Sequence, residues 1–146
     1  MTYRLHNRLG YRVSRLARLM EARHEAALAG DGLTRLGASV LGGVGDEGVT
    51  TPSELAAYVG ITRPAMSRLL RGLEARGFIA RAATDGDGRQ TRVALTPQGQ
   101  AALTRVRAAS DALQAHFAAK LRADELSFLT QTLARLAAGE PDPTDF

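Results

Sequence analysis

The chain has 146 residues, 45% of them hydrophobic, and contains no cysteine. This length suits one ordinary domain with a real core, and the lack of cysteine excludes disulfides, thiolate metal sites and a thiol redox switch. The net charge is +4, with six arginines against two glutamates in residues 1–30 and seven arginines against four acids in residues 51–97, which favours a polyanionic partner.

Residues 1–30 predict a long amphipathic helix. Its apolar stripe is Leu5, Leu9, Val13, Leu16, Met20 and Ala27, and six arginines lie off the stripe. Charged residues are spread through the segment and the chain has no run of 18 apolar residues, which argues against a signal peptide or a membrane span. We therefore expect a cytoplasmic protein with no membrane partner.

Gly30 and Gly32 are expected to end that helix, and Thr34 to cap a second one from Arg35 to Val44. Residues 43–48 then fit the bare GxGxxG pattern of dinucleotide-binding folds. However, no buried strand precedes this segment and no helix opens at its third glycine. We interpret it as a connection between helices and predict no cofactor.

Residues 51–97 predict a winged helix-turn-helix lobe. Thr51, Pro52 and Glu54 form an N-cap, a first-turn proline and a capping-box partner, so a helix begins there. Gly60 supplies the turn and Thr62 caps the second helix, which places the helix-turn-helix at residues 52–76. Met66, Leu69, Leu70 and Leu73 recur at i, i+3, i+4 and i+7 and are expected to face the core.

The other side of the second helix carries cations and small polar groups suited to phosphates and base edges. The DNA-binding residues that we predict there are Thr62, Arg63, Pro64, Ala65, Ser67, Arg68 and Arg71. Gly77 ends the helix, and two strands within residues 78–95 form the wing. At its tip, Arg89 is expected to enter a minor groove, oriented by Asp87.

The wing tip also hints at a calcium loop, since residues 85–88 read Asp-Gly-Asp-Gly. This interpretation fails because Arg89 occupies the third ligand position and Thr96 the place of the bidentate glutamate. We predict no metal site there. A second metal set, Glu21, His24 and Glu25 on one side of the first helix, lacks companion ligands and fits a solvated or dimer-contact surface better.

Residues 98–138 predict two further helices. The first carries Leu103, Val106, Leu113, Phe117 and Leu121, and the second, capped by Asp124, carries Leu126, Leu129, Leu133 and Leu136. Residues 139–146 form a tail. The stripes of 1–30 and 98–138 exceed what one lobe can cover, so we predict a two-fold dimer, with a bundle inside one chain as the alternative. A dimer would place two recognition helices about 34 Å apart and favour an inverted-repeat operator.

Several segments follow the order and spacing of one family. They are Leu55-Ala56 with Gly60, residues 62–69, Leu73-Glu74-Ala75-Arg76-Gly77, Asp87-Gly88-Arg89 and residues 95–99. With helices on both sides, the chain resembles the MarR (multiple antibiotic resistance regulator) family over most of its length. The resemblance implies a mainly α fold (α+β), a winged helix-turn-helix flanked by dimerisation helices, and a dimeric, ligand-responsive transcription factor.

We therefore expect a homodimeric repressor that binds double-stranded DNA and is released by a small-molecule effector, with His24 as a lining residue of the effector pocket. Two alternatives stay open. One is a winged-helix protein-interaction module without sequence-specific DNA binding. The other is a small enzyme, although His6, His24 and His116 are far apart in the sequence and none has the companions of a catalytic triad. We predict no catalytic residues.

Overall fold

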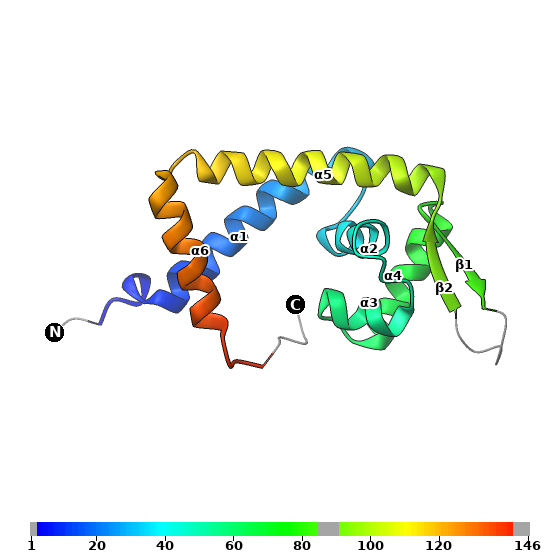
Figure 1. Ribbon diagram of the computed structural model, residues 1–146, viewed down its shortest axis with the longest axis horizontal. Coiled ribbons are helices and arrows are strands. Elements are labelled where there is room, and N and C mark those ends of the chain that lie inside the picture. Colours follow the sequence, from blue (N-terminus) through cyan, green and yellow to red (C-terminus); the bar gives the residue numbers. More distant parts are fainter. Residues whose placement is uncertain (1–2, 85–90, 142–146) are drawn as a thin grey trace.

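The computed structural model describes residues 3–84 and 91–141, which form a mainly helical chain with one described two-stranded antiparallel sheet (Figure 1). In chain order the elements are a 3-10 helix Leu5–Asn7, α1 Leu9–Leu28, a 3-10 helix Ala29–Asp31, α2 Arg35–Gly45, α3 Pro52–Val59, α4 Arg63–Ala75, β1 Ile79–Ala83, β2 Thr91–Leu95, α5 Pro97–Ala118 and α6 Ala123–Ala137. The predicted fold class is confirmed.

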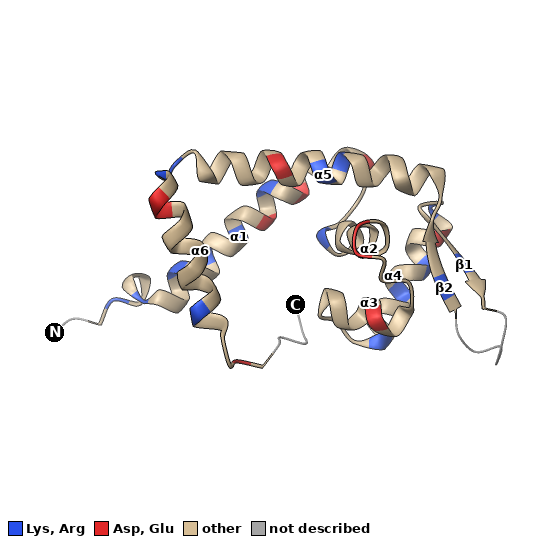
Figure 2. Cartoon of the chain, in the orientation of Figure 1, with Lys and Arg blue, Asp and Glu red and all other residues tan. Residues whose placement is uncertain are grey.

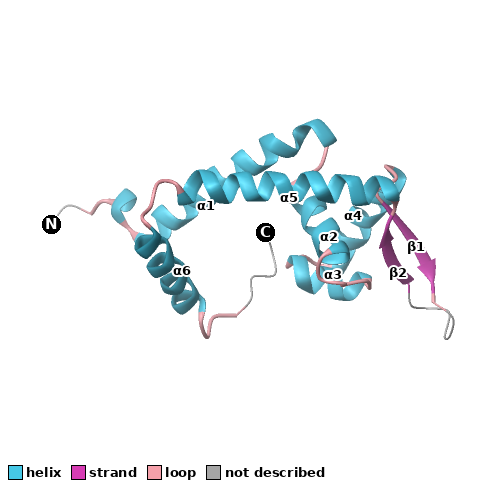
Figure 3. Ribbon diagram, turned by 45° about the horizontal axis from the view of Figure 1, so that its top comes forward, coloured by secondary structure: helices cyan, strands magenta, loops and turns pink. Residues whose placement is uncertain are grey.

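Helix α5 runs along one side of the molecule and connects its two ends (Figure 1). Helices α2, α3 and α4 and the sheet gather at one end, while α1 and α6 lie at the other. A second view shows the hairpin projecting from the lobe beside α4 (Figure 3). The surface that we expect to bind DNA is thus separated from the surface that we expect to dimerise.

Threonine caps start the two helices of the helix-turn-helix, as predicted. The Thr51 hydroxyl accepts a hydrogen bond from the Glu54 backbone N–H at 3.4 Å and donates to Glu54 Oε2 at 2.7 Å. The Thr62 hydroxyl accepts from the Ala65 backbone N–H at 3.3 Å. Between the helices, Gly60 has φ +81°, a left-handed conformation that glycine adopts without steric cost. These contacts fix where α3 and α4 begin and how they cross.

The core of the described residues joins the lobe to the first half of α5. Met66, Leu70 and Leu73 are buried and Leu69 packs against them, which confirms the predicted core face of α4. The remaining buried apolar residues are Leu28, Leu33, Ala38, Val40, Leu41, Leu55, Ala56, Phe78, Ile79, Val93, Ala102, Leu103 and Val106. A Cβ at Gly99 would overlap the backbone carbonyl oxygen of Phe78, so glycine allows α5 to approach the hairpin.

One expectation for the first helix was wrong. The helix begins at Leu9, because Leu5 lies in a separate 3-10 turn and Arg8 is extended, with φ −77° and ψ 142°. Ala27 is exposed, whereas its neighbour Leu28 is only 1% exposed. Within the single chain α1 therefore contributes Leu28 to the core, while Leu9, Val13 and Leu16 of the predicted stripe stay exposed, as a dimer contact requires.

Three further local predictions were also wrong. The second helix, predicted from Arg35 to Val44, ends at Gly45, so the connection predicted over residues 43–48 begins only at Asp46; Gly43 and Gly45 let α2 pack closely against Tyr58 and Leu103. Leu121 lies beyond the end of α5. Asp124 is not the N-cap of α6, since Arg122 precedes the helix and donates its backbone N–H to Glu125 Oε2 at 2.9 Å.

Large apolar side chains remain exposed on the helices away from the lobe. On the N-terminal segment they include Leu9 and Leu19, which are 61% and 54% exposed, and on α6 they are Phe128, Leu129, Leu133 and Leu136. They do not form the intramolecular bundle that was our alternative. In the described part of the chain, no helix is both long enough and apolar enough to cross a membrane.

Candidate nucleic-acid interface

Helix α4 presents its polar face outward. At 100° per residue, Pro64, Arg68 and Arg71 lie opposite Met66 and Leu70. All three outer side chains are exposed, whereas the two core residues are buried. The helix therefore offers two guanidinium groups at its most protruding line, where a duplex groove would meet them.

The other predicted residues of α4 lie on its flanks. Thr62 is exposed, and its hydroxyl accepts the N-cap hydrogen bond of α4. Arg63 is exposed at the first position of the helix. Ala65 and Ser67 are half-buried, and the Ser67 hydroxyl accepts from Arg71 Nη1 at 3.5 Å. The structure thus brings all seven predicted residues of α4 to one end of the lobe, with Arg68 and Arg71 outermost.

A groove separates the start of α4 from the hairpin. Its volume is about 650 Å³, and it is lined by Gly48, Thr50, Thr51, Pro52, Ser53, Glu54, Arg63, Thr91 and Arg92. Arg92 of β2 donates to the Thr50 hydroxyl at 3.1 Å, and the neighbouring Val93 N–H donates to the Thr50 carbonyl at 2.7 Å. Arg63 and Arg92 therefore approach one groove from two different elements, an arrangement suited to a phosphate.

Sequence reasoning missed Arg92. The signal was present, because strand residues alternate between faces and buried Val93 forces Arg92 outward. What the sequence does not reveal is that the turn before α3 brings Thr50 to this side chain.

An ion pair ties the hairpin to the back of α4. Arg81 of β1 donates through Nε and Nη2 to Glu74 Oε2 at 3.0 and 2.6 Å, and its backbone N–H donates to Glu74 Oε1 at 3.3 Å. The side-chain hydrogen bonds from Arg81, and to a lesser extent its positive charge and its backbone N–H, lower the pKa of the Glu74 carboxyl. The base of the hairpin is thereby held at a fixed angle to α4.

The predicted wing-tip residues Asp87 and Arg89 lie outside the described residues, as does the Asp-Gly-Asp-Gly motif. In the part of the chain that is described, no cluster of three or more histidine or acidic side chains is placed to hold a metal. Glu21, from the metal set that we set aside, pairs with Arg35 of α2 at 3.8 Å.

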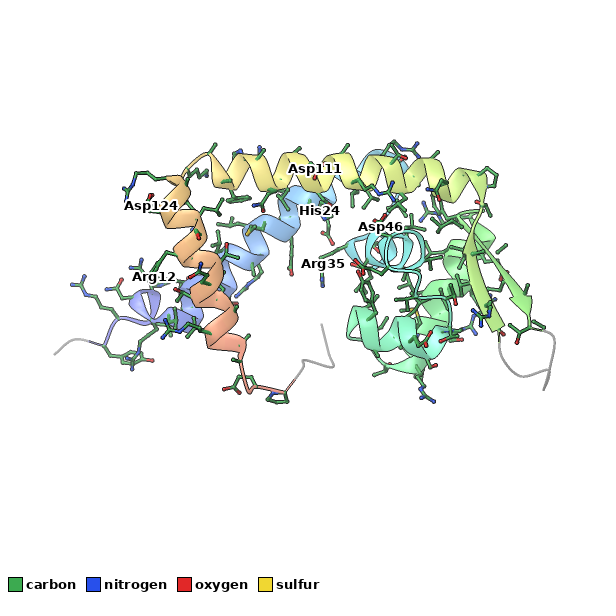
Figure 4. The ribbon with its side chains drawn as sticks, in the orientation of Figure 1. Arg12, His24, Arg35, Asp46, Asp111 and Asp124 are labelled. Carbon is green, nitrogen blue, oxygen red and sulfur yellow. The ribbon has the colours of Figure 1, made fainter. Side chains whose placement is uncertain are left out.

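A second cavity, of about 420 Å³, lies between the lobe and the long helices. Its lining comes from α1, α2, α3 and α5 and comprises His24, Ala38, Ser39, Gly42, Asp46, Tyr58, Val59, Leu103, Val106, Arg107, Ser110 and Asp111. Figure 4 shows Asp111 in the middle of α5, His24 of α1 beneath that helix, and Asp46 at the end of α2. The cavity thus touches both halves of the molecule, and it includes the predicted pocket residue His24.

Polar contacts bridge this cavity. His24 Nε2 lies 3.2 Å from the Ser110 hydroxyl, a pair that the sequence did not reveal. Arg107 Nε donates to Asp46 Oδ1 at 2.9 Å, and the hydrogen bonds to that carboxylate raise the pKa of Arg107. Within the described residues, His24 has no carboxylate bonded to its second ring nitrogen, the group that would orient it in a catalytic triad.

Positive charge is not confined to the lobe. Figure 2 shows basic residues on α4 and β2 and again on α1 and α6 at the opposite end. The lobe is distinguished by geometry, since its arginines converge on one helix face and one groove, whereas those of α1 are spread along the helix.

Comparison with known proteins places this geometry in context. A model of the MarR family matches residues 31–90. The HTH-type transcriptional repressor Rv2887 of Mycobacterium tuberculosis is 31% identical over 130 residues, which span 89% of this chain and 94% of that protein. The Mycobacterium bovis repressor Mb2911 matches equally well.

Solved structures share the fold across nearly the whole chain. A mutant MarR from E. coli in complex with operator DNA has a TM-score of 0.81 at 23% identity, covering 92% of this chain and 99% of that chain. The PcaV regulator of Streptomyces coelicolor, in complex with its natural ligand, has a TM-score of 0.78 at 21% identity, covering 97% and 99%. At these identities the likeness concerns the fold.

Proposed function

The chain belongs to the MarR family of transcriptional regulators, and from this membership we propose that it is a homodimeric repressor that binds an inverted-repeat DNA operator and releases it when a small-molecule effector binds. The observation that carries the proposal is the outward face of α4, where Arg68 and Arg71 protrude beside the groove shared by Arg63 and Arg92. We further propose Asp87 and Arg89 as wing contacts, on their sequence position alone.

Each part of this surface has a distinct task in the proposal. Arg68 and Arg71 enter the major groove, where a guanidinium can donate two hydrogen bonds to guanine. Arg63 and Arg92 bind the phosphate backbone and set the register of the helix on the duplex. Because Arg81 and Glu74 lock the hairpin to α4, both sets of contacts form together.

The homodimer is supported by the exposed apolar side chains of α1 and α6. Leu9, Leu19 and Phe128 are each more than half exposed in the single chain. A second copy of the chain would bury these side chains in a dimer interface. A two-fold axis through this region would also repeat α4 once on each half-site of an inverted repeat.

The proposed effector site is the cavity that contains His24. Both the lobe and the long helices line it, so a ligand that fits one relative orientation better shifts the dimer toward that orientation. Since the chain contains no cysteine, release by thiol oxidation is excluded.

The test is selection of binding sites from a random duplex library, followed by titration of the selected duplex at several salt concentrations and with a panel of small aromatic acids and bases. We expect an inverted repeat, affinity that falls steeply with salt, and release by at least one compound. If the protein binds no duplex even at low ionic strength, it is instead a winged-helix protein-interaction module.

A further inference from the structure

Arg76, the residue that follows α4, leaves the helix to bind another part of the chain. Its Nη1 donates to the Gly32 carbonyl at 2.7 Å and its Nη2 to the Asp31 carbonyl at 2.9 Å. One planar guanidinium thus holds two successive carbonyls in the turn between α1 and α2, about 45 residues away in the sequence. Lysine cannot reproduce this fork, because its ammonium is a single point donor.

The turn is shaped to receive this group. Gly32 has φ +63°, and a Cβ there would lie 2.7 Å from Arg76 Nη2, so a side chain would be strained and would collide with the guanidinium. The two carbonyls follow the C-terminal end of α1, where helix carbonyls lack intrahelical partners and the helix dipole favours a cation. The aromatic ring of Phe78 lies 5.0 Å below the guanidinium carbon.

The same turn is fixed to α5. The Asp31 carboxylate accepts from Arg105 Nε at 2.7 Å, and only 20% of the Asp31 side chain is exposed. Gln98, near the start of α5, donates to the Arg76 carbonyl at 3.3 Å. Arg76 therefore stands at a joint where the end of α4 meets the end of α1 and one face of α5.

Among the described residues, three side-chain hydrogen bonds link the C-terminal end of α4 directly to other elements. Two join it to the α1–α2 turn and one joins it to α5. Helix α4 also packs against α2, α3 and β1, and α2 in turn packs against α5. The hydrogen bonds of Arg76 add a direct link between the C-terminal end of α4 and the long helices, at the end opposite the one that carries Arg63.

We propose that Arg76 is a positioning residue that sets the angle of the recognition helix to the dimer helices, and so determines which half-site spacing the dimer accepts. The inference rests on the proposed function, because only a dimer bound to two half-sites converts an angle into a spacing. Arg76 itself need not touch DNA. Its loss should relax the choice of spacing while leaving the DNA-contacting side chains in place.

The test compares Arg76→Lys with the wild type on the selected operator, on the same operator with one base pair added or removed between half-sites, and on random duplex. Arg122→Lys is the matched control, because Arg122 is exposed and its ion-pair partners within the described residues are its sequence neighbours Asp124 and Glu125. We expect the wild type and the control to lose about tenfold or more on altered spacing, since a misplaced half-site forfeits its base contacts. In Arg76→Lys, the ratio of the affinities for the selected spacing and for the altered spacing should fall below half of the wild-type ratio. The affinity for random duplex should be unchanged.

A readout without DNA separates this inference from the proposed function. The chain has no cysteine, so Ala75→Cys and Ala112→Cys allow spin labels on exposed positions of α4 and α5, with labelled chains diluted into unlabelled ones. Arg76→Lys should broaden the distance distribution between the labels. An unchanged distribution, or an equal loss of affinity on every duplex, would overturn the inference. A wild type that binds no duplex would overturn only the proposed function.

Discussion

At the residue scale, the interface divides into side chains that protrude and side chains that brace. Arg68 has no hydrogen-bond partner among the described residues, whereas Arg92 already donates to Thr50. A free guanidinium on the outermost line of α4 can adapt to base edges. The Arg92 guanidinium is held beside a groove and is therefore preorganised to bind a phosphate, a group that duplex DNA carries whatever its base sequence.

This difference predicts opposite effects on specificity. Arg68→Ala should cost about 1–3 kcal/mol of binding free energy on the operator and much less on random duplex. Arg92→Ala should weaken binding to both duplexes by a similar factor and reduce the slope of log affinity against log salt by about 1. Fluorescence anisotropy titrations at four salt concentrations measure both effects. Equal, sequence-independent losses in the two variants would refute the division of tasks.

Residue patterns in the sequence predicted most of α4 because local rules govern it. Thr62 caps the helix, and the spacing of Met66 and Leu70 fixes its buried side. The contacts of Arg92 and Ser110 could not be predicted, since each depends on a residue 42 or more positions away in the chain. Such pairs arise from the crossing of elements, about which local periodicity says nothing.

At the element scale, the side chains of Glu74 and Arg81 form the ion pair between α4 and the hairpin in the described part of the chain. Both side chains are half-buried, with 28% of Arg81 and 38% of Glu74 exposed, and because solvent still reaches the pair it contributes modestly to global stability. Its geometric effect is larger, because three hydrogen bonds to one carboxylate fix both the position and the rotation of β1.

Glu74→Gln should therefore reduce operator affinity by a few-fold with almost no change in the thermal midpoint. The wild type should also show a pH effect with a defined sign. Since the Glu74 pKa is lowered in the fold, the ion pair is fully present above the ordinary carboxyl pKa and is lost as the pH falls through the folded-state pKa. NMR titration of the Arg81 amide should follow this transition, and an Arg81 amide that titrates identically in Glu74→Gln would contradict the assignment.

Element boundaries were harder to predict than element types. The sequence placed α3, α4 and the hairpin correctly because threonine caps and glycine turns mark their ends. It failed at residues 43–45, where glycine signalled a connection but serves close helix packing. Glycine has both uses, and only the neighbouring Tyr58 and Leu103 decide between them.

At the scale of the whole molecule, α5 is the element that relates DNA binding to dimerisation. Its first half is buried in the lobe through Leu103 and Val106, while its second half leads to the exposed helix α6. The cavity at His24 and the joint at Arg76 both lie along its course. A change at the dimer end can therefore reach α4 through a continuous set of contacts.

The dimer itself can be tested on α6. Leu129 lies at the centre of its exposed apolar face, and Gln131 lies on the opposite face of the same helix. We expect the wild type to have twice the 15.5 kDa mass of one chain by light scattering. Leu129→Glu should dissociate the dimer, because each copy loses about 2 kcal/mol of apolar burial and gains a desolvated charge, and the two-fold axis doubles both effects. Gln131→Glu should remain dimeric. A dissociated Leu129→Glu that still binds the full operator as tightly as the wild type would show that the two recognition helices act independently.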